Sequence, residues 1–116
     1  MKMRLFTTAL LATALIAVGS PLPAQAAADA AQPTITIKNK MFDPAELTVP
    51  AGQKIKLTVK NEDADASEFE SLELNREKVV PAHEEVTVFI GPLDPGAYPF
   101  FNDFDPQKST GKIIAK

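Results

Sequence analysis

Residues 54–60 read Lys-Ile-Lys-Leu-Thr-Val-Lys, so every second side chain is aliphatic and the side chains between are charged or polar. A period of two predicts a β-strand with one buried face and one face in water. Similar runs occur along the chain at residues 34–38, 47–49, 86–90, 98–100 and 111–116. Helical periodicity is missing between these runs, and the sequence therefore predicts an all-β chain.

Turn-forming residues separate the predicted strands. They are Asp43-Pro44, Pro50-Ala51-Gly52, Asn61-Glu62-Asp63, Gly91-Pro92, Asp94-Pro95-Gly96 and Asp105-Pro106. Short strands spaced by such turns are typical of two packed antiparallel sheets, so we predict a Greek-key β-sandwich of about seven to eight strands. Between residues 64 and 75 the alternation breaks before Leu72, which indicates a bulge, a bend or one short helical turn.

The N-terminus has the arrangement of an export signal. Lys2 and Arg4 precede an uncharged apolar run that leads to Ala24-Gln25-Ala26, the small-x-small pattern of a cleavage site. The run is shorter than the roughly 20 residues that span a bilayer. We predict a signal peptide at 1–26, a flexible leader at 27–33 and one domain at 34–116, in a periplasmic protein that does not span the membrane after signal removal. An uncleaved N-terminal anchor is the alternative.

Composition restricts the chemistry that this chain can perform. The net charge is −3, and removal of residues 1–26 takes away Lys2 and Arg4 but no acidic residue, which makes it −5. That charge argues against nucleic acid or an anionic membrane as partner. The chain has no cysteine and one histidine, so thiolate chemistry is excluded and no self-contained catalytic constellation is present. We assign no enzymatic activity.

Three stretches resemble the cupredoxin family. The first runs from Phe42 to Gly52 and reads Phe-Asp-Pro-Ala-Glu-Leu-Thr-Val-Pro-Ala-Gly; the second, Asp94 to Phe100, is similar to the family's Pro-Gly-x-Tyr-x-Phe strand. The third, Gly111-Lys112-Ile113-Ile114, resembles the family's last strand. Together they extend over nearly the whole predicted domain, and the resemblance implies a cupredoxin-like sandwich.

The copper ligands of that family are not matched. A type 1 copper site needs two imidazoles and a thiolate, with a weak axial thioether. The resemblance implies that these ligands would fall at Ser67, Asn102, Asp105 and Ser109, none of which is His, Cys or Met. A type 1 copper site is therefore excluded.

Carboxylates occupy the loops where the resemblance implies copper ligands. Oxygen donors suit iron better than cuprous copper. The surrounding stretches 68–71, 76–80 and 90–93 resemble cupredoxin-like proteins of bacterial ferrous-iron uptake, namely the N-terminal domain of EfeO-type proteins and the FtrB-type periplasmic partner of an iron permease. The resemblance implies that the chain binds iron, or a copper ion in a different site, and relays it to periplasmic or inner-membrane iron-transport components. The candidate metal ligands are Met41, Glu68, Glu70, Asp103 and Asp105.

Other interpretations of these residues stay open. Acidic loop residues in an acidic protein are often only solvated surface, and Arg76 is a potential ion-pair partner of a nearby glutamate. Strand alternation buries Phe100 and leaves Phe101 on the other face, so Phe101 and Phe104 form a candidate docking patch. The alternative function is a metal-free interaction module. A copper carrier with an open site built from Met41, His83 and carboxylates is a third hypothesis, although the polar flanks of His83 predict an exposed turn.

Overall fold

The computed structural model describes residues 32–105 and 109–116, together with Met3 and Gly19. Apart from Met3 and Gly19, the predicted signal peptide lies outside the described residues, as does most of the predicted leader. Within the described ranges the chain forms nine β-strands and no helix. Consequently no helix of this part is both long and apolar enough to cross a membrane. The all-β prediction is confirmed.

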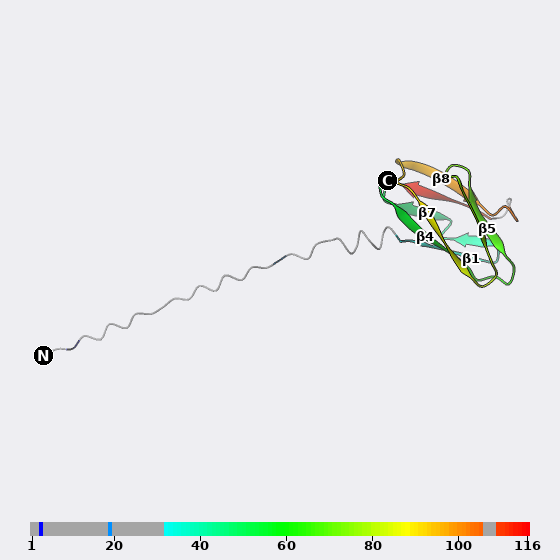
Figure 1. The fold of residues 1–116 in the computed structure, drawn as a ribbon, viewed down its shortest axis with the longest axis horizontal. Helices are drawn as coiled ribbons and strands as arrows, with labels where there is room; N and C mark the ends of the chain where they lie inside the picture. The colour runs from blue at the N-terminus through cyan, green and yellow to red at the C-terminus, as the bar shows by residue number, and fades with distance from the viewer. Residues whose placement is uncertain (1–2, 4–18, 20–31, 106–108) are drawn as a thin grey trace.

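Two sheets pack face to face (Figure 1). The first has the order β2-β1-β4-β7 and consists of β1 (Thr34–Lys38), β2 (Met41–Asp43), β4 (Ile55–Asn61) and β7 (Glu85–Ile90). The second has the order β3-β9-β8-β5-β6 and consists of β3 (Glu46–Val49), β5 (Ser67–Ser71), β6 (Arg76–Val80), β8 (Gly96–Phe101) and β9 (Thr110–Ala115). The sheets are mixed rather than purely antiparallel, because β1 pairs with β4 and β3 pairs with β9 in parallel. Neither parallel pair joins strands that are consecutive in the chain.

The core lies between the sheets and is filled by the alternating apolar side chains. Ile55, Leu57 and Val59 of β4 are all buried, as the period of two predicts. Phe100 meets Phe42 edge-on at 4.9 Å between ring centroids, and Phe69 at 5.0 Å. Such ring pairs stabilise a core beyond their buried area, by about 1 kcal/mol each.

Strand β2 was not among the strands predicted from the sequence. After Lys38 the chain reverses through Asn39 and Lys40, whose φ angles are 52° and 60°. A type I′ turn, one of the two-residue turns that fit a β-hairpin best, requires positive φ angles at both central residues. The carboxylate of Asp63 accepts hydrogen bonds from both backbone N–H groups of that turn, each at 2.8 Å. Met41 therefore lies in a strand paired with β1. Three residues are too few to give a periodic signal.

The hairpin of β5 and β6 determines which acidic side chains are neighbours. A turn at residues 72–75 joins the two strands, in agreement with the predicted break in alternation. The antiparallel register pairs Glu70 with Glu77 and Glu68 with Val79. All four side chains therefore leave the hairpin on one face.

Candidate functional site

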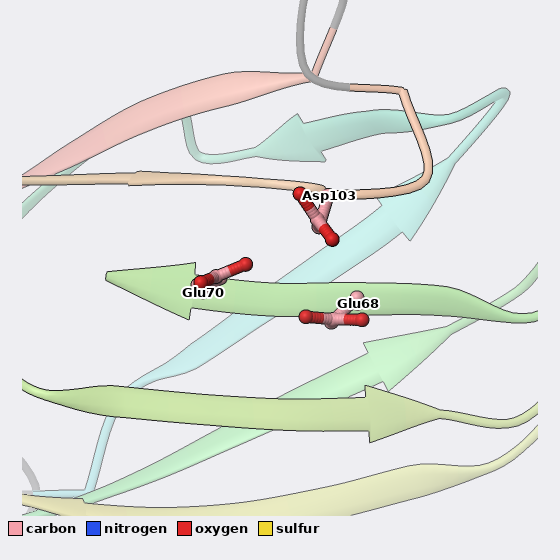
Figure 2. A group of neighbouring side chains, drawn as sticks. All are labelled: Glu68, Glu70 and Asp103. Atoms are coloured by element: carbon pink, nitrogen blue, oxygen red, sulfur yellow. The ribbon is translucent and has the colours of Figure 1, made fainter. Parts of the chain in front are cut away.

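Glu68 and Glu70 lie on the outer face of the five-stranded sheet. Alternation along β5 directs the buried Phe69 into the core and both glutamates to the opposite side. Figure 2 shows the two carboxylates side by side along the strand.

Asp103 reaches the same place from the loop that follows β8. One carboxylate oxygen from each of Glu68, Glu70 and Asp103 lies within 4.8 Å of the others, and in Figure 2 the Asp103 side chain is directed toward the two glutamates. We call these three residues the carboxylate cluster. β8 ends at Phe101, the residue that pairs with Glu70, and this pairing brings the loop onto β5.

Burial makes Glu68 the unusual member of the cluster. Only 4% of the residue is exposed, and within the described part of the chain its Oε1 atom has no hydrogen-bond partner. Burial, followed by the nearby Glu77, Asp103 and Glu70, raises the pKa of Glu68 from 4.5 to about 7. A buried oxygen without a partner is costly for a protein unless a proton or a cation compensates it.

Glu77 is a further acidic residue at this place, and the sequence analysis did not identify it. It is the Cα partner of Glu70, so its side chain leaves the hairpin on the face that carries Glu68 and Glu70, and its proximity helps to raise the pKa of Glu68. The signal was present in the sequence, because a four-residue turn between two five-residue strands places residue 77 opposite residue 70.

No cationic side chain neutralises the cluster within the described residues. Among the described residues, the one ion pair joins the Lys112 Nζ atom to the Glu46 Oε2 atom at 3.8 Å, away from the cluster. Arg76 instead donates hydrogen bonds to the backbone carbonyls of Phe89, at 2.8 Å, and Asn75, at 2.9 Å. The alternative of an Arg76–glutamate ion pair does not occur, because Arg76 pairs with Ser71 and leaves the sheet on the other face.

Two predicted ligands lie away from the cluster. Met41 is 55% exposed and pairs with Lys38 on the outer side of the four-stranded sheet. Asp105 is half-buried and lines a separate cavity of about 90 Å³ at the end of the sandwich. His83 is exposed in a turn with φ 58°, as predicted, and belongs to neither place.

The four positions expected to correspond to copper ligands are gathered at that same end. The Asn102 carbonyl accepts from the Asp105 N–H at 3.0 Å, and the Asn102 N–H donates to the Ser109 carbonyl at 2.9 Å. Ser67, Asn102 and Asp105 line the cavity, and the Ser109 hydroxyl donates to the Lys40 carbonyl. The side-chain groups that these four positions could offer to a metal ion are hydroxyls, an amide and a carboxylate.

The two candidate docking aromatics differ in exposure. Phe104 is 55% exposed and lines the cavity. Phe101 is half-buried on the outer face of the five-stranded sheet, where it pairs with Glu70. Phe101 thus borders the carboxylate cluster, and Phe104 borders the cavity.

The family model of the cupredoxin-like domain matches residues 7–115 of this sequence. The chain belongs to the cupredoxin-like domain family. It is 44% identical over 80 residues to an uncharacterized protein of Rickettsia prowazekii (strain Madrid E), across 69% of this chain and 64% of that protein. The chain therefore spans less than two thirds of the length of this relative.

Solved cupredoxins share the fold of this cupredoxin-like protein at low sequence identity. Auracyanin A, a blue copper protein from Chloroflexus aurantiacus, is 18% identical with a TM-score of 0.63, over 73% of this chain and 98% of that one. The purple cupredoxin from Nitrosopumilus maritimus is 16% identical with a TM-score of 0.56, over 72% and 98%. Amicyanin from Paracoccus versutus is 17% identical with a TM-score of 0.58, over 78% and 88%. These likenesses establish the fold alone.

The residues of this cupredoxin-like protein do not fit a type 1 copper ion. Such a centre needs a thiolate and two imidazoles, whereas the chain holds no cysteine and a single histidine. The unpartnered carboxylate oxygen lies in the carboxylate cluster and not at the end of the sandwich. The carboxylate cluster itself offers oxygen donors only.

Proposed function

We propose that this protein binds a hard metal ion, iron above all, at the carboxylate cluster and relays it to a periplasmic or inner-membrane component of an iron-transport system. The observation that carries the proposal is the Oε1 atom of Glu68, which is buried beside two further carboxylates and has no partner among the described residues. A cation there would compensate the buried charge, and carboxylate oxygens are ligands that hard cations prefer.

The iron assignment rests on the donor set and on the sequence resemblance. The cluster offers carboxylates and neither imidazole nor sulfur. This set favours ferrous, ferric or manganous ions over cuprous copper. The location in the periplasm follows from the N-terminal export signal that the sequence predicts, and the transport partner follows from the resemblance to EfeO-type and FtrB-type proteins.

Calorimetric titration of the purified protein with ferrous ion under anaerobic conditions, and with manganous and cupric ions, tests the proposal. We expect saturable binding of iron and manganese that Glu68→Gln weakens by about tenfold or more, because the amide supplies no negative charge to the metal. Glu85→Gln is the matched control, since Glu85 is exposed on β7 in the other sheet. It should leave the affinity unchanged.

The alternative function, a metal-free interaction module, predicts a different result. The wild-type protein would then bind none of the three ions, and Glu68→Gln would have no effect on a metal titration. The exposed Phe104 and Met41 would become the first residues to substitute in a search for a protein partner.

A further inference from the structure

Glu77 lies across from the carboxylate cluster on the edge strand of the five-stranded sheet. It is the Cα partner of Glu70, and side chains opposite each other in an antiparallel pair have Cβ atoms about 5 Å apart on the same face. Its negative charge is also near enough to Glu68 to help raise the pKa of that group. Carboxylates held this close repel one another unless a proton or a cation lies between them.

We propose that Glu77 is a fourth ligand of the carboxylate cluster and that the resulting four-carboxylate site binds a hard trivalent cation more tightly than a divalent one. This inference rests on the proposed function, because it uses the same site. Four negative donors attract a trivalent ion more strongly than a divalent ion of similar size, since the Coulomb energy grows with the product of the charges. The site thereby favours ferric over ferrous iron.

The other nearby acidic residues are less suited to this role. Asp105 lines the separate cavity, and Glu46, on β3 at the opposite edge of the same sheet, pairs with Lys112. Glu77 is exposed on β6, which has no further strand on its outer side within the described residues. Its side chain can therefore turn toward a cation without disturbing the sheet.

The edge position also determines where the coordination shell is open. Glu68 supplies the buried oxygen beneath the site, whereas Glu77 supplies an exposed ligand at its rim. A hard cation takes six or more oxygen ligands, so the remaining positions are left for water or for the ligands of a receiving protein. Glu77 is then the ligand that is released first when the ion leaves.

Terbium(III) is a suitable probe, because it is a hard trivalent ion without redox chemistry and its luminescence lifetimes in H₂O and D₂O report the number of coordinated waters. We expect Glu77→Gln to lower the terbium affinity of the purified protein by about tenfold or more and to admit about one additional water. The preference for terbium over manganese should fall as well. Glu73→Gln, in the turn between β5 and β6, removes the same charge and should change neither affinity nor water count.

The outcomes separate this inference from the proposed function. If Glu77→Gln binds terbium as the wild type does, or loses affinity with an unchanged water count, the fourth ligand is disproved while the three-residue site stands. If Glu73→Gln matches Glu77→Gln, only overall charge matters and the fourth ligand is again disproved. If wild-type protein binds neither terbium nor iron, both proposals are wrong.

Discussion

The side-chain oxygen of Asn102 accepts a hydrogen bond from the backbone N–H of Glu68 at 2.8 Å. The same oxygen accepts from the N–H of Phe104 at 3.2 Å. Asn102 itself is only 2% exposed. One buried amide thus links β5 to the loop that carries Asp103, and it stabilises the relative position of the two segments that build the carboxylate cluster.

Truncation of this amide should destabilise the fold and weaken the metal site together. Asn102→Ala leaves two N–H groups without an acceptor, one of them buried, and we expect a loss of about 2–4 kcal/mol in the free energy of unfolding. Chemical denaturation measures this loss, and terbium titration should report a weaker site. Gln53→Ala, an amide truncation at an exposed turn residue, should change neither the free energy of unfolding nor the terbium affinity. Equal stability of Asn102→Ala and wild type would contradict the role of the hydrogen bonds.

The pKa of Glu68 predicts that the metal-free protein loses stability as the pH rises. Its pKa is raised by burial and by its acidic neighbours, from 4.5 to about 7. Between these values the folded protein retains a proton that the unfolded chain has already released, so the free energy of unfolding falls as the pH increases. The loss is complete above about pH 7 and amounts to roughly 3 kcal/mol, because each pKa unit corresponds to about 1.4 kcal/mol.

Glu68→Gln isolates this contribution, since its neutral amide does not titrate. Above about pH 7 the variant should be more stable than metal-free wild type by about 1–3 kcal/mol, and below about pH 4.5 the difference should vanish. Denaturant unfolding at several pH values measures both. Glu85→Gln, on the other sheet, controls for net charge. Parallel pH profiles for wild type and Glu68→Gln would show that burial does not destabilise the ionised side chain.

The core leaves no room for a side chain larger than hydrogen at Gly111. Gly111 is the Cα partner of Phe100 in the β8–β9 pair. A Cβ atom at this position would meet the Phe100 ring and lie 2.6 Å from the Ala45 carbonyl oxygen. We expect Gly111→Ala to cost about 1–3 kcal/mol through overpacking. Thermal unfolding checks this, with Thr110→Ala at the neighbouring exposed residue as the control; a Gly111→Ala variant as stable as that control would contradict the steric argument.

The proposed export signal implies a defined N-terminus for the mature protein. Cleavage after Ala26 is expected, because Ala24 and Ala26 supply the small side chains that a signal peptidase requires. Intact-mass spectrometry of protein recovered from the envelope fraction should give a chain that starts at Ala27. Ala26→Phe should retain the precursor, whereas Ala28→Phe should still be processed. A full-length chain in the wild-type sample would favour the uncleaved anchor.

The sandwich was predictable because its strongest strands are regular. In β4 and β7 the aliphatic residues alternate over seven and six positions. A period of two over that length indicates a β-strand with one buried face. The three-residue β2 carries no such pattern. Its position depends on the Asn39-Lys40 turn and on the distant Asp63, and contacts between residues 23 and 24 positions apart leave no local trace.

The candidate site was predictable only in part, for a related reason. Alternation along β5 was enough to give Glu68 and Glu70 a common face, and the loop after the β8 strand supplied Asp103. The burial of Glu68 and the proximity of Glu77 depend on the register of the β5–β6 hairpin. Met41 and Asp105 were grouped with the others by the resemblance, but they lie on the other sheet and in the end cavity.

Separate substitution of Asp103 and Asp105 distinguishes the two places where this fold gathers polar residues. Asp103 belongs to the carboxylate cluster, whereas Asp105 lines the 90 Å³ cavity beside Asn102. Asp103→Asn should therefore weaken binding of ferrous ion and terbium by about tenfold or more, because a charged ligand is lost. Asp105→Asn removes the same charge two residues away and should retain wild-type affinity in the same calorimetric titration. If Asp105→Asn is the weaker binder, the cation lies at the end of the sandwich, where the sequence resemblance implies copper ligands, and the carboxylate cluster is only acidic surface.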